Sequence, residues 1–307
     1  MIIITSGQLH TDIDILASAL AYKELMDKTG KESQVVLPGS LNESVSASVR
    51  KWKINYLINP PKENKNLQFI IVDISEPKYF AHFVQEENII KLFDHHLIGF
   101  EKYWQKKLGN KSVIEEIGAC ATLIWEEFKK NKVDTKIQPT SANLLYTAIL
   151  SNTLNLQASV TTERDIKATQ EIVKYTHLPK NWEKQYFDEV SASVLANPIN
   201  AMKNDTKLQE INNKKFAMIQ IELWDSFEFV ELFQDDIIKV LSSFSQEYAF
   251  FTSPSISEGK NYIIALDEKT QDLLQKSIPI NFKGLIGTTK ELFLRKEIIK
   301  KLLTVKE

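Results

Sequence analysis

Cysteine is almost absent from this sequence of 307 residues: Cys120 is the only one, so no intrachain disulfide can form. A single thiol is typical of a protein from a reducing compartment. No apolar run approaches the roughly 18 residues of a membrane-spanning helix. The apolar stretch at the start is short and lacks the basic segment of a signal peptide. We therefore expect a cytoplasmic protein with no membrane partner.

A strong charge of either sign is also missing, because the formal net charge is −2. This balance gives no electrostatic reason to expect nucleic acid as a partner. Hydrophobic residues make up 43% of the chain and charged residues 25%, which supplies enough apolar material for two cores. The length fits one large domain or two ordinary ones.

The first half of the chain alternates short β-branched runs with amphipathic stretches. The expected strands are 2–5, 35–37, 67–72, 89–93 and 112–117, and the expected helices are 14–29, 43–52, 77–84, 119–130 and 140–151, with a loop from His96 to Gly109. Strands that alternate with helices, without hairpin turn signals, predict an α/β domain with a mostly parallel sheet flanked by helices.

The pattern of predicted helices and strands changes near residue 190. Residues 161–194 are expected to be helical, and Ala196-Asn197-Pro198 breaks that pattern. Strands are expected at 215–221, 248–252 and 262–266, and a helix at 227–243. We predict two domains, 1–190 and 191–307, of which the second is a smaller α/β domain with a mixed sheet.

Three apolar strands of the first domain end in carboxylates or imidazoles. The first strand leads to Asp12 and Asp14, the third to Asp73, and the fourth to Asp94-His95-His96. Buried polar groups are costly unless something pairs with them, and oxygen donors with an imidazole suit Mn²⁺ or Mg²⁺. Asp12 and Asp14 can each serve one of two ions about 3.5–4 Å apart, with Asp73 as the bridge.

Successive segments of the chain resemble the motifs of the DHH phosphoesterase superfamily, and in particular those of manganese-dependent (family II) inorganic pyrophosphatase, with exopolyphosphatase and prune-like proteins as relatives. In the first domain these segments are 12–22, 72–73, 93–96, 117–123 and 148–154. In the second, 205–207 and 294–299 are similar to the phosphate-binding segments of the family's C-terminal (DHHA2-like) domain. The resemblance spans nearly the whole chain, in order.

The resemblance implies a role for each matching residue. Asp12 and Asp14 each bind one ion, Asp73 bridges both, and His95 binds one. His96 faces the substrate as a hydrogen-bond donor or acid, and Asp94 orients an imidazole. The residues implied to reach the phosphates from the second domain are Lys207, Arg295 and Lys296.

Two positions depart from the family pattern. Gln8 replaces the first metal-binding histidine, and Asn152 replaces the aspartate of a Ser-Asp-Thr motif. An amide oxygen can ligate a hard cation but is neutral, so it binds less strongly than a carboxylate. We keep both as candidate ligands, with His10 as a substitute for the missing imidazole.

The resemblance implies hydrolysis of inorganic pyrophosphate to two phosphates by a hydroxide that two Mn²⁺ ions activate, with Mg²⁺ or Co²⁺ as alternatives. Two other interpretations stay open: hydrolysis of short polyphosphate or another small phosphoester, and a non-catalytic phosphate-binding homologue. A small-molecule substrate, pyrophosphate or short polyphosphate, is expected if the protein is a hydrolase. The resemblance also suggests a homodimer through the N-terminal sheet.

Overall fold

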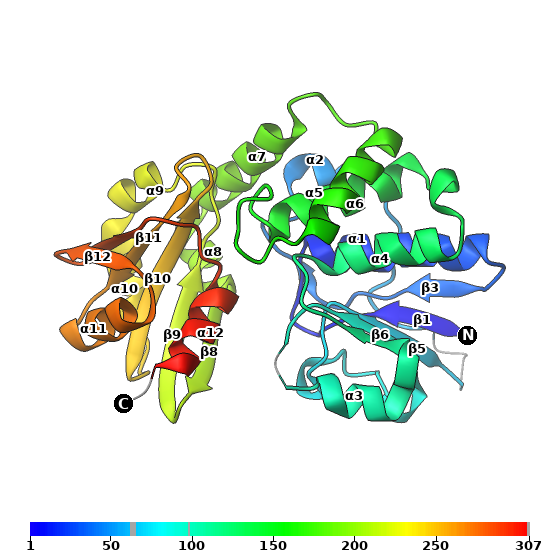
Figure 1. Cartoon of the computed structure of the whole chain (residues 1–307), viewed down its shortest axis with the longest axis horizontal. Coiled ribbons are helices and arrows are strands. Elements are labelled where there is room, and N and C mark those ends of the chain that lie inside the picture. Colours follow the sequence, from blue (N-terminus) through cyan, green and yellow to red (C-terminus); the bar gives the residue numbers. More distant parts are fainter. Residues whose placement is uncertain (62–65, 98, 306–307) are drawn as a thin grey trace. The chain divides into compact units, whose positions relative to one another are not determined.

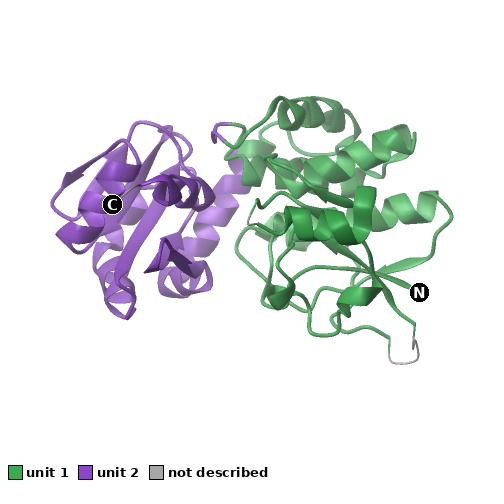
Figure 2. Cartoon of the chain, turned by 60° about the horizontal axis from the view of Figure 1, so that its bottom comes forward, with its two compact units in different colours: residues 1–156, 160–183 green, residues 157–159, 184–307 purple. Residues whose placement is uncertain are grey.

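The computed structural model describes residues 1–61, 66–97 and 99–305, and the chain divides into two compact units (Figure 2). Unit 1 consists of residues 1–156 and 160–183, and unit 2 of residues 157–159 and 184–307. The division falls near the start of α7 (Trp182–Ala196). The predicted domain boundary at 190/191 stays a prediction. Among the described residues, no helix combines the length and apolar character needed to cross a membrane.

Unit 1 is built on a parallel sheet of five strands in the order β3-β1-β5-β6-β7. The strands are β1 (Ile2–Thr5), β3 (Ser33–Val35), β5 (Gln68–Val72), β6 (Ile89–Asp94) and β7 (Ser112–Ile114). A small second pair joins β2 (His10–Thr11) to β4 (Ser40–Leu41). The central strands are buried on both faces, which explains their continuous apolar sequences.

Helices cover both faces of this sheet (Figure 1). On one face lie α1 (Ile13–Lys28), α4 (Cys120–Lys130), α5 (Pro139–Asn152) and α6 (Glu163–Ile172), and on the other lies α3 (Glu101–Leu108). Asp12 is the N-cap of α1, because its carboxylate accepts a hydrogen bond from the Ile15 amide at 2.8 Å. Pro139 opens α5, where a missing N–H costs nothing.

Unit 2 is built on a mixed sheet of six strands in the order β12-β13-β11-β10-β9-β8, in which only β9 and β10 run parallel. Its strands are β8 (Thr206–Ile211), β9 (Lys214–Gln220), β10 (Tyr248–Ser255), β11 (Lys260–Ala265), β12 (Ile280–Lys283) and β13 (Ile286–Thr289). Its helices after α7 are α8 (Pro198–Asn204), α9 (Phe227–Leu232), α10 (Gln234–Ser242), α11 (Glu268–Ser277) and α12 (Arg295–Thr304).

Successive residues of the unit 2 strands supply two separate cores. Phe250 belongs to the cluster that includes side chains of α11 and α12, whereas Phe251 belongs to the cluster that includes side chains of α9 and α10. This alternation follows from the two-residue period of a strand. The α/β fold class predicted for both parts of the chain is therefore confirmed.

Several predicted elements are wrong in detail. The helix predicted at 43–52 is only α2 (Ala47–Arg50), because the Asn42 side chain accepts hydrogen bonds from both the amide and the hydroxyl of Ser44 just before it. The helix predicted at 77–84 is a single 3-10 turn at Pro77–Tyr79, because the Ala81 amide donates to the Ser6 carbonyl instead. The loop predicted after His96 contains α3.

Other predicted elements of unit 2 are divided or missed. The helix predicted at 227–243 is split into α9 and α10 at Phe233. Neither β8, β12 nor β13 was predicted, because their short sequences carry polar residues on exposed positions and no long apolar run.

A buried carboxylate, Asp165, fixes the turn that precedes α4. It accepts hydrogen bonds from the Gly118 amide (2.9 Å), the Thr122 hydroxyl (2.6 Å), and both the amide and hydroxyl of Thr162 (2.8 and 2.7 Å). A side chain at Gly118 is excluded, since its Cβ would lie 2.5 Å from the Thr153 methyl carbon. The α4 turn is therefore held to α6 by one side chain.

We expect Asp165→Asn to lower the free energy of unfolding of unit 1 by about 1–3 kcal/mol. The substitution replaces one carboxylate oxygen with an NH₂ group, which cannot accept the hydrogen bonds that this oxygen receives in the wild-type chain. Urea unfolding monitored by tryptophan fluorescence measures this loss. Asp27→Asn is the matched control, because Asp27 sits in an exposed ion pair with Lys23 and such pairs contribute about 1 kcal/mol at most. Equal stability of the two variants would contradict the role of Asp165.

Candidate metal centre

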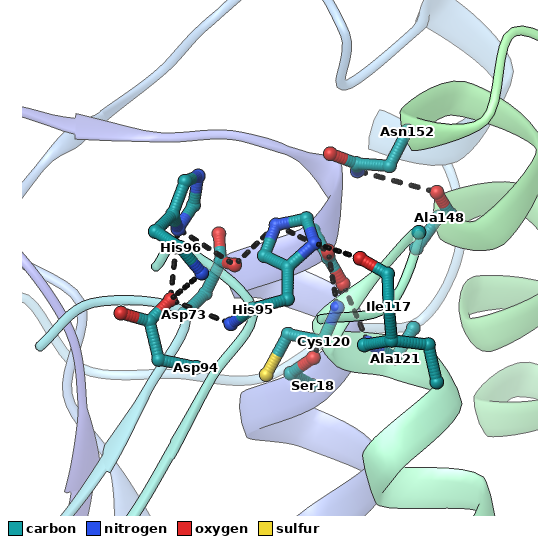
Figure 3. Close-up of polar contacts among 12 residues, drawn as sticks. Ser18, Asp73, Asp94, His95, His96, Ile117, Cys120, Ala121, Ala148 and Asn152 are labelled. Atoms are coloured by element: carbon teal, nitrogen blue, oxygen red, sulfur yellow. Dashed lines mark hydrogen bonds and ion pairs between the residues drawn. The ribbon is translucent and has the colours of Figure 1, made fainter. Parts of the chain in front are cut away.

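The carboxyl ends of β5 and β6 and the start of α1 bring acidic and imidazole side chains to one edge of the unit 1 sheet (Figure 3). Asp73 follows β5, His95 and His96 follow β6, and Asp14 lies in the first turn of α1. Parallel strands end at the same edge of a sheet, which explains why residues far apart in sequence meet there.

Asp14 is fully buried, and its carboxylate lies against the N-terminus of α4. It accepts hydrogen bonds from the amides of Cys120 and Ala121, both at 2.8 Å, and from the Ser18 hydroxyl at 3.3 Å. A helix N-terminus favours a negative charge, because its amide groups point outward without helical partners. These contacts fix the orientation of the carboxylate.

His95 is oriented by a backbone carbonyl. Its Nδ1 donates to the Ile117 carbonyl oxygen at 3.1 Å, so the neutral ring carries its proton on Nδ1 and a lone pair on Nε2 (Figure 3). That Nε2 lies 3.3 Å from Asp73 Oδ1 and 3.8 Å from Asp14 Oδ2. This is the ring arrangement that metal-ligating histidines require.

Asp73 adopts a left-handed backbone conformation, with φ of 59°, directly at the end of β5. Aspartate and asparagine visit this region more readily than other non-glycine residues, at a cost of order 1 kcal/mol or more. The Asp73 amide donates to the Phe93 carbonyl at 2.8 Å, which continues the β5–β6 pairing. The turn thus places the carboxylate beside His95 with 7% of the residue exposed.

Asp94 orients His96. One carboxylate oxygen, Oδ1, accepts from Nδ1 of His96 at 2.8 Å and from the backbone amides of His95 and His96 at 2.8 and 3.1 Å. The His96 ring therefore directs Nε2 away from Asp94, and its side chain is 38% exposed. The orienting contact expected for Asp94 is present.

These residues fit a divalent cation. Donor atoms of Asp73, His95 and His96 all lie within 4.8 Å of one another. Two ligand atoms about 2.1 Å from one ion lie about 3.0–3.4 Å apart at tetrahedral or octahedral angles. The Asp73–His95 separation of 3.3 Å falls in that range, and buried carboxylates gain from a cation that neutralises them.

Asp12 is the fourth predicted acidic ligand. Burial raises the pKa of its carboxyl, while the hydrogen bond from Ile15 and the nearby imidazoles of His96 and His10 act in the opposite direction. Its carboxylate is therefore within electrostatic reach of His96. The predicted roles of Asp12, Asp14, Asp73 and His95 as ligands stay predictions.

The three neutral candidates lie differently. Gln8 Oε1 accepts hydrogen bonds from the backbone amide of His82 (2.9 Å) and from its Nδ1 (2.7 Å), a contact that nothing in the sequence signals. Asn152, at the end of α5, donates through Nδ2 to the Ala148 carbonyl at 3.3 Å (Figure 3). His10 is exposed on the short strand β2. Their roles as ligands also stay predictions.

Unit 2 contains the predicted basic residues. Arg295, at the start of α12, forms an ion pair with Asp205 at 2.7 Å and donates to the Asp205 and Met218 carbonyls. The two segments predicted to bind phosphate, 205–207 and 294–299, therefore lie together within this unit. Lys207 is exposed on β8, and Lys296 is the second residue of α12.

Curated relatives match most of the chain, although no protein-family model does. A protein of Lactobacillus helveticus (strain DPC 4571), named probable manganese-dependent inorganic pyrophosphatase, is 23% identical over 291 residues, covering 88% of each chain. A Clostridium acetobutylicum protein of the same name is 26% identical over 295 residues, covering 92% of this chain and 90% of the relative.

Solved structures show the same fold. A Methanococcus jannaschii protein, designated a candidate family II inorganic pyrophosphatase, has a TM-score of 0.73 at 20% identity and covers 98% of this chain and 99% of its own. An exopolyphosphatase-related protein from Bacteroides fragilis has a TM-score of 0.51 at 14% identity, covering 98% and 89%. The resemblance found in the motifs is thus confirmed along nearly the whole chain: this protein is similar in sequence to manganese-dependent inorganic pyrophosphatases and has the fold of the family II structure.

Proposed function

We propose that this protein is a metal-dependent hydrolase of phosphoanhydride bonds that converts inorganic pyrophosphate into two phosphates. The observation that carries this proposal is the cluster of Asp14, Asp73 and His95, with donor separations of 3.3 and 3.8 Å. The relatives named as manganese-dependent pyrophosphatases support the substrate and the metal, since they match 88–98% of the chain.

In this proposal Asp12, Asp14, Asp73 and His95 hold two divalent ions, with Asp73 between them. Bound divalent ions acidify water and offset the negative charge that develops on the phosphates. Ile117 and the α4 amides keep His95 and Asp14 in their binding orientations. Mn²⁺ is the proposed ion, and Mg²⁺ and Co²⁺ are the alternatives to test.

His96 is proposed to contact the substrate. Its Nδ1 is held by Asp94, so Nε2 can donate a hydrogen bond to a phosphate oxygen or give a proton to the leaving phosphate.

Arg295, Lys296 and Lys207 are proposed to bind the phosphate groups. Guanidinium and ammonium groups donate charge-assisted hydrogen bonds that are stronger than neutral ones. Asp205 fixes the guanidinium of Arg295 from one side, which reduces the entropy lost when an anion binds.

A second candidate function is hydrolysis of short polyphosphate, which the fold shared with an exopolyphosphatase-related protein supports. A non-catalytic phosphate-binding role is the third candidate, because Gln8 and Asn152 are neutral where the family pattern has a histidine and an aspartate. A homodimer through the unit 1 sheet stays a prediction that sedimentation analysis can test.

Purified protein with Mn²⁺ is expected to release orthophosphate from pyrophosphate. A colorimetric phosphate assay should compare pyrophosphate, tripolyphosphate and longer chains, each with Mn²⁺, Mg²⁺ and Co²⁺. Fastest release from pyrophosphate supports the first candidate function, and fastest release from tripolyphosphate supports the second. Absence of release with every substrate and metal would leave only the phosphate-binding role.

Asp73→Asn is expected to lower Mn²⁺ affinity by at least about 100-fold, because it replaces a charged ligand shared by both ions with a neutral one. Asparagine tolerates the positive φ at this position, so the fold should be retained. Isothermal titration calorimetry measures the affinity, and Asp225→Asn, at an exposed site in unit 2, is the control. Unchanged Mn²⁺ affinity in Asp73→Asn would remove Asp73 from the metal site.

Arg295→Gln is expected to lower kcat/KM for pyrophosphate about 10- to 100-fold, the effect of losing a charge-assisted hydrogen bond of about 1.5–3 kcal/mol. Lys290→Gln removes one positive charge from an exposed position of the same unit and should have little effect.

A second variant separates binding from folding. Asp205→Asn breaks the same ion pair but keeps the guanidinium, so it should retain most of the activity. Equal losses in Arg295→Gln and Asp205→Asn would show that Arg295 acts only through the stability of unit 2.

A further inference from the structure

The proposed donor set carries less negative charge than two divalent ions carry positive charge. Its charged members are the carboxylates of Asp12, Asp14 and Asp73, so the donors contribute three negative charges. The remaining members, including the amides of Gln8 and Asn152, are neutral. Two divalent cations bring four positive charges, and affinity for hard cations depends strongly on the charge of the ligands.

One of the two proposed cation positions has donors that the fold already supports. Asp73 Oδ1 and Asp14 Oδ2 lie 3.3 and 3.8 Å from Nε2 of His95, and all three residues are buried. Each side chain has its own support, from the α4 amides, the β5–β6 pairing and the Ile117 carbonyl respectively. An ion can bind here with little rearrangement of the protein.

The other position is less complete. The proposed function leaves Asp12 and Asp73 for it, and the family resemblance adds position 8 as a candidate ligand. The carbonyl oxygen of Gln8, however, already accepts two hydrogen bonds from His82, at 2.7 and 2.9 Å. Turning that oxygen to a metal ion would break both bonds, one of them to a backbone amide. One carboxylate oxygen of Asp12 also accepts a hydrogen bond from the Ile15 amide at the start of α1.

We propose that the two cation positions fill unequally: the position at Asp14, Asp73 and His95 binds its ion from protein ligands alone, and the position at Asp12 and Asp73 binds a second ion only together with a diphosphate anion. This inference rests on the proposed function, because it assumes a diphosphate ligand. The anion makes two contributions. Its oxygen atoms bind the ion in place of Gln8, and its negative charge adds to that of the three carboxylates. Hard cations commonly bind in this way, through one or two carboxylates and substrate phosphates.

Equilibrium dialysis tests the inference without any turnover. Bound Mn²⁺ per chain is measured by atomic absorption, at a free Mn²⁺ concentration that saturates the first binding event, with and without the non-hydrolysable methylenediphosphonate. The expected result is one ion per chain without the anion and two with it. Asp12→Asn should stay at one ion in both conditions.

Gln8→Glu tests the charge argument directly. The added carboxylate should bring the bound Mn²⁺ to two ions per chain without any anion. Gln85→Glu is the matched control: it makes the same substitution at an exposed position outside the proposed donor set, three residues after His82, and should stay at one ion.

Two ions bound to the wild-type chain without methylenediphosphonate, or one ion in its presence, would overturn the inference. So would a Gln8→Glu chain that binds one ion without the anion. These results differ from a failure of the proposed function: a chain that shows the change from one ion to two but releases no phosphate in the hydrolysis assays would lose the catalytic role and keep the anion-linked metal site.

Discussion

Buried negative charge at the carboxyl edge of one parallel sheet is the constraint on which the rest of unit 1 depends. Asp14 and Asp94 are fully buried and Asp73 nearly so. An ionised carboxylate in such a place is costly unless hydrogen bonds and opposite charges compensate it. Backbone amides provide part of this compensation, from the start of α4 for Asp14 and from the turn after β6 for Asp94. The fold thus stabilises these charges before any cation is considered.

The groups that stabilise these buried carboxylates are themselves held in place by residues farther from the site. Asp165 holds Gly118 and therefore the turn between β7 and α4. The same turn presents the Ile117 carbonyl to His95 and begins the helix whose amides bind Asp14. A side chain of α6 that accepts hydrogen bonds from Gly118, Thr122 and Thr162 therefore supports the orientation of two proposed ligands. Disturbance of this turn should alter the metal site by moving its supports, even where every ligand is retained.

The sequence predicted the strand ends well, because apolar runs that stop at Asp or His are visible locally. Asp73, Asp94 and His95 were found in this way, and the fold class followed from the alternation of strands and helices. Contacts between distant segments could not be predicted from local patterns: Asp14 meets Cys120 across 106 positions, and Gln8 meets His82 across 74. The helix expected at 77–84 was wrong for the same reason, since its backbone pairs with the chain that follows β1.

The one thiol beside the proposed metal site is a poor ligand for soft metals. Cys120 is fully buried at the start of α4, and its Sγ lies 3.8 Å from the Phe93 carbonyl oxygen as a weak donor. Burial raises the pKa of this thiol well above its usual value, and the negative charges of Asp14 and Asp73 raise it further. Only the thiolate is a good ligand for soft metals. With the pKa of the Cys120 thiol raised in this way, the other donors at this edge are carboxylate, amide and imidazole, a set that suits Mn²⁺ and Mg²⁺ better than copper(I) or an iron–sulfur cluster.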